Sequence, residues 1–264
     1  MISVFEIFLN PVTQCILALY AFLLIWEFVF PGRELPVVKG WRLRGIAVFL
    51  LYLYLSSYLP LLWDKYLAKF QLINLSHLAL WQSVVIAILV YEFGMWGWHW
   101  SMHQSDFLWR VFHQMHHSAE RLDAYGAFYF SPADIFGWTL LGSLCFTFIT
   151  GLSPEAVTIA LLITTFLSIF QHANIKTPQW LGYIIQRPES HTVHHAKGIH
   201  AYNYSDLPLF DIIFGTFRNP KGFEHETGFY DGASARITDM VLFKDINAET
   251  ETNFANLKST TGHE

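Results

Sequence analysis

The stretch Trp98–Ser118 reads WHWSMHQSDFLWRVFHQMHHS and is the most informative part of the sequence. It contains an HxxxH pattern followed by an HxxHH pattern, and HxxHH returns as HTVHH at 191–195. These three boxes contain His99, His103, His113, His116, His117, His191, His194 and His195. On a helix, residue i+4 lies one turn above residue i, and i+3 and i+4 flank the line through i. An HxxHH helix therefore presents three imidazoles from one face and can bind one metal ion while reaching toward a second.

A ninth histidine, His172, ends an apolar stretch as part of QHANI at 171–175. Pro188 precedes the third box at a position suited to the first turn of a helix. Imidazole ligands suit zinc, copper, iron and nickel alike, so the ligand type leaves the metal open. Nine histidines exceed what one ion can bind, and we predict a site for two metal ions. The zinc-protease pattern HExxH does not occur in these boxes.

The composition indicates a membrane protein. Apolar residues make up 53% of the 264 residues and charged residues only 14%, against about 25% charged in an average soluble domain. A net charge of −5 gives no reason to expect a nucleic-acid partner. Cys15 and Cys145 both lie in apolar surroundings, which excludes a disulfide framework and a thiolate metal site.

Runs of about 20 uncharged residues can cross the hydrocarbon layer as helices. Three runs fit as single crossings: Val4–Phe30, Gly45–Leu62 and Leu72–Tyr91. The fourth, Ile135–Ile175, is long enough for a hairpin of two, with a turn near Gly151. We therefore predict an all-α, polytopic helix bundle with four or five crossings and a helical cap that holds the di-metal site. The start of the chain lacks the features of a cleaved signal peptide.

The basic residues are distributed asymmetrically about these crossings. Of the 16 Lys and Arg, all but Lys65 and Lys69 fall on the side of the boxes. Basic loops mark the cytoplasmic face, so we expect a multi-pass protein of a bacterial inner membrane or the endoplasmic reticulum with a cytoplasmic catalytic face.

The chain is expected to have three parts. These are membrane helices over 1–91, a catalytic region over 92–221 that includes the hairpin 135–175, and a cytoplasmic tail over 222–264. From about Asp245 onward the tail has few large apolar residues, and we expect this end to be mobile.

The boxes and their surroundings resemble the fatty acid hydroxylase/sterol desaturase superfamily of integral-membrane di-iron oxygenases. The first two boxes match its HxxxH, Leu-Trp, Phe-His and HHS arrangement in order and spacing. The stretch FYFSPAD at 128–134 resembles its Phe-x-x-x-Pro-x-Asp segment. The third box is followed, as in the family, by Asn-Tyr and Asp-x-x-Phe-Gly-Thr. The resemblance extends from about Glu92 to Pro220.

The resemblance implies hydroxylation or desaturation of a sterol-like or acyl lipid with O2. It assigns the eight box histidines and His172 as ligands of two iron ions, for which zinc can substitute. Electrons would come from a ferredoxin or cytochrome b5 with its reductase, because no cytochrome b5-like domain precedes the membrane part. Fatty-acid 2-hydroxylases have HxxxxH first and another HxxxH before the last box. This chain has HxxxH first and Lys176 four residues after His172, which favours the sterol-desaturase-like branch.

Five further side chains are candidates for supporting the metal ligands. Carboxylates near the third box can accept hydrogen bonds from ligand imidazoles and offset the cationic metal charge. The candidates are Glu189, His200, Asn203, Asp206 and Asp211. A solvated surface or a helix cap explains the acidic residues equally well, and for Asn203 we favour a turn residue over a ligand that acts through water. His77, His225 and His263 are expected to be packed or hydrogen-bonded groups.

Two other functions fit the same histidines. A di-zinc membrane lipid hydrolase would use them to ionise water and would need no electron donor. A metal or haem carrier would bind without catalysis, although metal transport needs polar groups at mid-membrane, of which the uncharged runs offer few.

Overall fold

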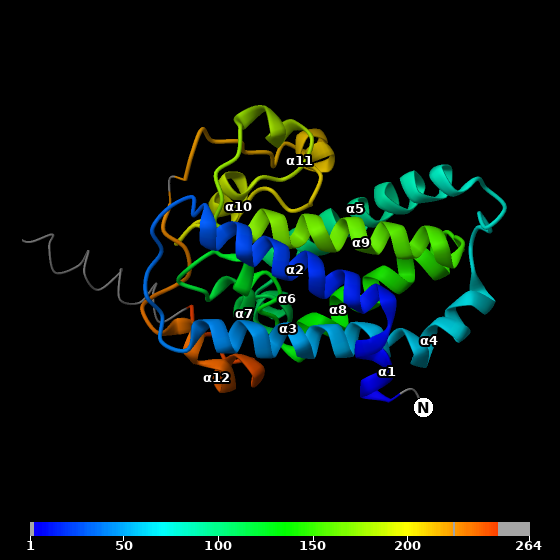
Figure 1. The fold of residues 1–264 in the computed structure, drawn as a ribbon, viewed down its shortest axis with the longest axis horizontal. Coiled ribbons are helices and arrows are strands. Elements are labelled where there is room, and N and C mark those ends of the chain that lie inside the picture. Colours follow the sequence, from blue (N-terminus) through cyan, green and yellow to red (C-terminus); the bar gives the residue numbers. More distant parts are fainter. Residues whose placement is uncertain (1–2, 224, 248–264) are drawn as a thin grey trace, which may run out of the picture.

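Helices form all the regular structure in residues 3–223 and 225–247, which the computed structural model describes (Figure 1). The α-helices are α1 (Val4–Leu9), α2 (Pro11–Val29), α3 (Trp41–Tyr58), α4 (Pro60–Leu67), α5 (Leu80–Gln104), α6 (Asp106–Phe112), α7 (Gln114–His117), α8 (Pro132–Ser143), α9 (Pro154–His172), α10 (Pro188–His194), α11 (Pro208–Phe214) and α12 (Ile237–Val241). A π-helical segment, Leu144–Ile149, continues α8, and 3₁₀ turns cover Ala68–Phe70, Ala124–Gly126, Gln179–Tyr183 and Ala233–Ala235.

Five helices are long and apolar enough to cross a membrane, which confirms the predicted all-α membrane bundle. The candidate spans are Pro11–Val29, Trp41–Phe70, Leu80–Gln104, Pro132–Ile149 and Pro154–His172. Large apolar side chains remain exposed along them, among them Phe22, Leu50, Val85 and Ile163. Such a surface suits hydrocarbon and not water, so the chain is a multi-pass membrane protein.

The predicted hairpin is confirmed, because α8 and its π-helical extension return as α9 through a tight turn. Gly151 adopts a left-handed φ of +49° there. The Ser153 hydroxyl then accepts a hydrogen bond from Ala156 N, and Pro154 occupies the first turn of α9. These are standard signals for starting a helix.

The crossing predicted at Leu72–Tyr91 is wrong in its first part, since α5 begins only at Leu80. The apolar residues before it form a loop against the end of the hairpin. The backbone N–H groups of Leu72, Ile73 and Leu75 donate to carbonyls of residues 148–150. Because these bonds satisfy the loop backbone, its apolar composition does not require a helix. His77 accordingly lies exposed in the loop and outside the span in which we predicted it.

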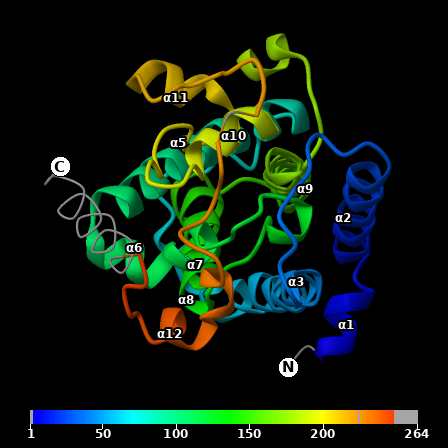
Figure 2. The ribbon, with the colours of Figure 1, turned by 90° about the vertical axis from the view of Figure 1, so that its left-hand side faces the viewer.

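All three boxes lie at one end of the bundle. The segments 30–40, 105–131, 173–223 and 225–247 are at this end, whereas 68–79 and 150–153 are at the other (Figure 1). Figure 2 views the bundle from the box end, with α10 and α11 on one side of α7 and α12 on the other. The five spans thus support a cap of short helices.

Buried acidic side chains connect the cap to the ends of the spans. Glu27, near the end of α2, accepts hydrogen bonds from Ala124 N at 2.9 Å and Asn174 N at 2.7 Å. Asp123 accepts one from Trp41 Nε1 at 2.8 Å. Glu27 thus satisfies two loop N–H groups, and the loop residue Asp123 satisfies the indole N–H at the start of α3. These bonds give buried donors a partner and hold the loops in register with the helices.

The described part of the predicted tail folds back on the second box. Met240 and Ile246 are buried, and Gln114 Nε2 donates to Lys244 O at 2.8 Å. The remainder of the end that we predicted to be mobile, together with His263, lies outside the described residues.

Candidate metal centre

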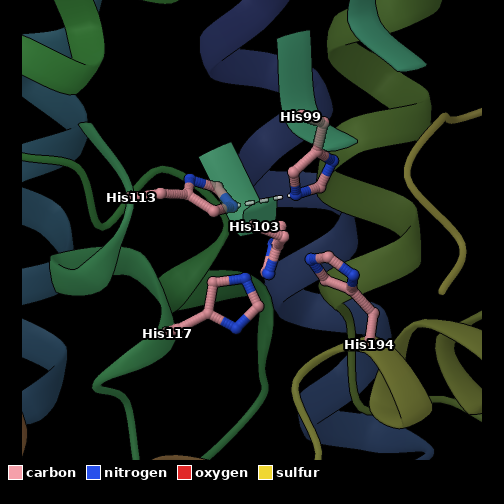
Figure 3. Close-up of side chains that lie close together, drawn as sticks. All are labelled: His99, His103, His113, His117 and His194. Carbon is pink, nitrogen blue, oxygen red and sulfur yellow. Dashed lines mark hydrogen bonds between the residues drawn. The ribbon is translucent and has the colours of Figure 1, made fainter. Parts of the chain in front are cut away.

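The nine predicted histidines come together in two groups, each of which could hold one metal ion. The first group is His99, His103, His113, His117 and His194 (Figure 3). The second group is His116, His172, His191 and His195. Within each group the available imidazole nitrogens all lie within 4.8 Å of one another. Residues from α5, α7, α9 and α10 therefore converge on a paired site at the box end of the bundle.

Each HxxHH box serves both groups. The second box places His113 and His117 in the first group and His116 in the second. The third box does the reverse, with His194 in the first group and the other two histidines in the second. Each triplet thus contributes to two neighbouring histidine groups at once.

The second box is not one continuous helix, contrary to the prediction. α6 ends at Phe112, and His113 adopts φ −145° and ψ −23° before α7 begins. The break changes the direction of the chain at His113, and its Nε2 lies 2.8 Å from His99 Nε2 on α5. The third box is helical as predicted, with Pro188 at the start of α10.

The contacts between imidazoles test whether metal ions fit these groups. In the second group, His172 Nε2 lies 3.0 Å from both His116 Nε2 and His191 Nε2, and His191 Nε2 lies 3.1 Å from His195 Nε2. Neutral imidazoles carry one N–H each, so nitrogens gathered in this way cannot all be satisfied by one another. A cation between them accepts every lone pair, and both groups fit a metal ion.

Backbone carbonyls set the orientation of three of these rings. The Nδ1–H of His99 donates to Tyr204 O at 2.7 Å, that of His172 to Ser168 O at 2.6 Å, and that of His194 to Tyr202 O at 2.7 Å. A carbonyl can only accept, so the bond places the proton on Nδ1 and leaves a lone pair on Nε2. This is the arrangement that a metal-binding histidine needs.

Burial keeps the box histidines of the cap neutral. The pKa values of His191, His194 and His195 lie well below the usual value, first because burial disfavours the charged ring and then because of neighbouring histidines. The same causes lower the pKa of His113, His116 and His117. The ligand set is therefore deprotonated at neutral pH without help from the metal.

These pKa shifts predict acid lability of the metal-free protein. The unfolded chain takes up protons below about pH 6.5, but the folded site does not, so stability falls as pH drops below that value. For His200, whose pKa burial lowers to about 4, the loss extends over the window from about 6.5 to 4. We expect the free energy of unfolding in detergent, measured at several pH values, to decrease between pH 6 and 5. The slope should correspond to the uptake of more than one proton on unfolding. A flat profile over this range would contradict the neutral histidine cluster.

Asp211 and Asp206 support the site through the loop after the third box. Asp211 accepts hydrogen bonds from Tyr204 N at 2.9 Å and Thr216 Oγ1 at 2.6 Å, which positions the loop whose carbonyl orients His99. Asp206 accepts from Gln171 Nε2 at 2.8 Å, beside His172. Burial raises the pKa of Asp206 to about 7. Neither residue has a hydrogen bond to a box histidine within the described part of the chain.

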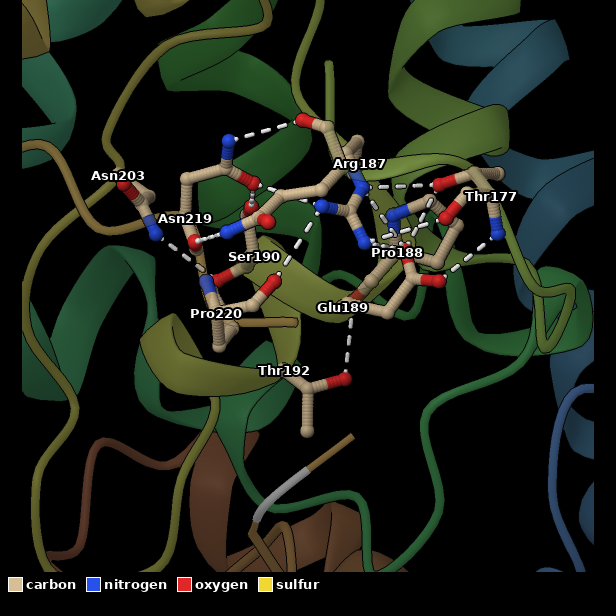
Figure 4. A network of polar contacts seen from close by, with 10 residues as sticks. Thr177, Arg187, Pro188, Glu189, Ser190, Thr192, Asn203, Asn219 and Pro220 are labelled. Carbon is tan, nitrogen blue, oxygen red and sulfur yellow. Dashed lines mark hydrogen bonds and ion pairs between the residues drawn. The ribbon is translucent and has the colours of Figure 1, made fainter. Parts of the chain in front are cut away.

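Glu189 belongs to a buried network around Arg187 (Figure 4). Arg187 Nη2 lies 3.0 Å from Glu189 Oε2, and both side chains are almost fully buried. Arg187 Nη1 donates to Asn219 Oδ1 at 2.8 Å, and Glu189 accepts from Thr177 N at 2.8 Å. The network attaches the start of α10, and hence the third box, to two distant loops.

Asn203 and His200 lie on either side of the third box. Asn203, at a left-handed φ of 50°, donates from Nδ2 to Ser190 O at 2.8 Å and accepts from Arg218 N at 2.7 Å. It is thus a turn residue that holds the loop to α10. His200 Nδ1 lies 3.1 Å from His117 Nδ1, in contact with a predicted ligand.

Two acidic residues near the site escaped the sequence-based predictions. Asp134 Oδ2 lies 3.8 Å from His113 Nδ1 and is the carboxylate next to the first group. Glu92, two turns before His99 on α5, is completely buried and accepts from Leu207 N at 2.9 Å. The signal for Asp134 was its place in FYFSPAD, and that for Glu92 was a charge at the end of an apolar run.

A cavity of about 70 Å³ extends from the histidines into the bundle. His99, His116 and His172 are among its lining residues on the site side. On the bundle side its wall is mostly apolar and aromatic, formed by Tyr52, Met95, Phe128, Phe130, Trp138 and Leu161. The predicted site thus faces a water-poor space within the membrane-spanning helices.

Comparison with known proteins identifies the family. The fatty acid hydroxylase family model matches residues 84–216, which is just over half of the chain and includes all nine histidines. The chain belongs to this family. No solved structure gives a significant match.

Curated relatives act on several lipids. Sphinganine C4-monooxygenase 1 of Arabidopsis thaliana is 28% identical over 64% of this chain and 65% of its own length. Ornithine lipid hydroxylase OlsE of Rhizobium tropici is 30% identical over 52% of this chain and 42% of its own length. Very-long-chain aldehyde decarbonylase GL1-9 of Oryza sativa subsp. indica is 27% identical over half of this chain. The chain therefore matches less than two thirds of the length of these relatives.

Proposed function

We propose that this protein is a membrane di-iron oxygenase that hydroxylates or desaturates a lipid with O2 and electrons from a separate redox protein. The observation that carries the proposal is the paired cluster of nine converging histidines, eight of which are buried. One relative is named as a lipid hydroxylase and another as a sphinganine monooxygenase, and the family match covers the whole cluster.

The nitrogen spacing favours iron over zinc. Two nitrogens bound at about 2.1 Å to one ion lie about 3.0 Å apart at a right angle and about 3.4 Å apart at the tetrahedral angle. The shortest separations within the groups, 2.8 to 3.1 Å, agree with the right angle. The first group also offers five histidines, more than a tetrahedral zinc site uses. These features support six-coordinate ions and disfavour the di-zinc hydrolase.

Iron in these two groups would supply the oxidising power that no side chain has. The chain's own contribution is to hold the imidazoles neutral, orient them through Tyr204, Ser168 and Tyr202 carbonyls, and keep water out. The aromatic wall formed by Phe128, Phe130 and Trp138 would place an apolar chain next to the histidines. A water-poor, preformed site of this kind suits attack on an unactivated C–H bond.

We propose that electrons reach the site from a separate redox protein, since these 264 residues contain no dinucleotide-binding fingerprint and only two cysteines. We expect purified, iron-loaded protein with lipid, O2 and NAD(P)H to be nearly inert. Adding a ferredoxin or cytochrome b5 with its reductase should start O2 uptake and product formation, measured together by an oxygen electrode and mass spectrometry. Sustained turnover without an added redox protein would contradict this scheme.

We propose that the box end faces the cytoplasm, because Arg33, Lys39, Arg42 and most other basic residues lie at this end of the bundle. A variant with Lys197→Cys in a Cys15→Ser background should resist a membrane-impermeant thiol reagent in intact cells and react after lysis. Lys197 is exposed beside the third box, and Lys69→Cys at the opposite end is the matched control that should react in intact cells. The reverse labelling pattern would overturn the orientation.

A further inference from the structure

A second cavity continues the first one away from the histidines. Its volume is about 160 Å³, close to that of a cavity that holds benzene in another protein. The two cavities share the lining residues Tyr52, Tyr91, Trp138 and Leu161. We call these four shared side chains the waist between the cavities. Leu161 is partly exposed on the outer surface of α9, so the waist adjoins the lipid-facing side of the bundle. The two cavities therefore adjoin across these four side chains, with the first next to the predicted metal site and the second nearer the opposite end of the bundle.

Part of the second cavity is polar. Ser56, Asp64, Ser143 and Thr147 line the second cavity, and the Asp64 carboxylate lies beside the hydroxyls of Ser143 and Thr147. Asp64 Oδ1 is buried and has no hydrogen-bond partner in the described part of the protein. An ionisable group that faces a cavity among membrane-spanning helices commonly marks the path of a substrate. Its free oxygen can accept a hydrogen bond from a ligand.

The distance between the two ends sets the length of a suitable ligand. Asp134 contacts His113 near the start of α8, and Ser143 ends the same helix. Nine residues of helix rise about 13 Å, which equals roughly ten bonds of an extended alkyl chain. The waist is formed by three aromatic rings and a leucine, so a slim chain can pass between them more easily than fused rings can.

We propose that the substrate is a linear lipid whose hydrogen-bond-donating end group binds Asp64, with the oxidised carbon about ten bonds away at the histidines. This inference rests on the proposed oxygenase function and specifies its substrate class. The acidic pocket would select a hydroxyl or amine end group, and the length of α8 would set the position of oxidation. The lipid would lie with its polar end away from the boxes.

Photolabelling in lipid nanodiscs tests this arrangement without O2 or electrons. The probes are two twelve-carbon primary alcohols, one with a diazirine next to the hydroxyl and one with it at the far end of the chain. The first should label residues around Asp64 and Thr147, and the second residues around Phe128 and Trp138, as mapped by mass spectrometry. Reversed labelling, or identical labelling by both probes, would overturn the proposal.

Variants and a matched ligand test the role of the carboxylate. Hydrogen bonds to charged groups justify an expected loss of labelling of about tenfold or more in Asp64→Leu. The methyl ether of the probe cannot donate a hydrogen bond. It should label the unmodified protein as weakly as the alcohol labels Asp64→Leu. Asp64→Asn preserves the shape and should lose less, whereas Glu155→Gln, an exposed acidic residue near the same end, should change nothing. Equal labelling by alcohol and ether in the unmodified protein would refute binding at Asp64. The proposed oxygenase function would not be affected by this result, because the O2-dependent assay tests it separately.

Discussion

Replacing His195 with alanine is expected to abolish lipid oxidation and to lower the iron content of the purified protein. His195 Nε2 lies 3.1 Å from His191 Nε2 in the second histidine group, and its ring is buried. A ligand set acts as a unit, so the loss of one imidazole should remove nearly all activity and not a fraction of it. His194→Ala should do the same through the first group. Iron per chain and product formation are the two measurements.

The control for these variants is His77→Ala. His77 lies exposed in the loop before α5, at the end of the bundle opposite the boxes, and its loss should leave iron content and activity unchanged. Full activity in either His194→Ala or His195→Ala would rule out the two-metal site. A selective loss of one iron in each variant would agree with the separation into two groups.

Removing the charge of Arg187 is expected to cause the largest loss of stability. Arg187 and Glu189 form an ion pair with almost no exposure, and Arg187→Met leaves the carboxylate buried and uncompensated. Breaking such a pair costs about 3–5 kcal/mol. Because the pair anchors the start of α10, iron retention should fall with stability. Unfolding in detergent, followed by circular dichroism, measures the effect.

The double variant Arg187→Met/Glu189→Leu is the matched control. Removing both charges avoids the uncompensated carboxylate, so the double variant should be more stable than Arg187→Met alone. The alternative is that the stability losses of Arg187→Met and Glu189→Leu add up to the loss of the double variant. This result would show that the ion pair is not what holds the third box in place.

The sequence predicted the bundle well where hydropathy and turn signals agreed. The hairpin with Gly151, Ser153 and Pro154 is an example, because helix length, glycine and capping residues all indicate the same turn. The start of α5 at Leu80 could not be predicted in this way. The apolar loop before it is stabilised by backbone hydrogen bonds to residues 148–150, and such long-range bonds leave no periodic pattern.

The histidines were predictable because they repeat at helical spacing, whereas their surroundings were not. The break at His113 depends on its approach to His99 on another helix. Asp134 reaches His113 because α8 packs beside α6, and Arg187 connects segments more than thirty residues apart. Tertiary packing decides these contacts, and a single sequence carries little trace of them.

The origin of the oxygen is the most direct test of the proposed oxygenase function. Iron-loaded protein in nanodiscs with lipid, a reductase and its redox partner should be supplied with ¹⁸O₂ in ordinary water. We expect a lipid product that either carries ¹⁸O in a new hydroxyl or has lost two hydrogens as labelled water forms, and we expect no product under argon. Product formation under argon, or oxygen taken from the solvent water, would contradict the oxygenase function and favour a hydrolase.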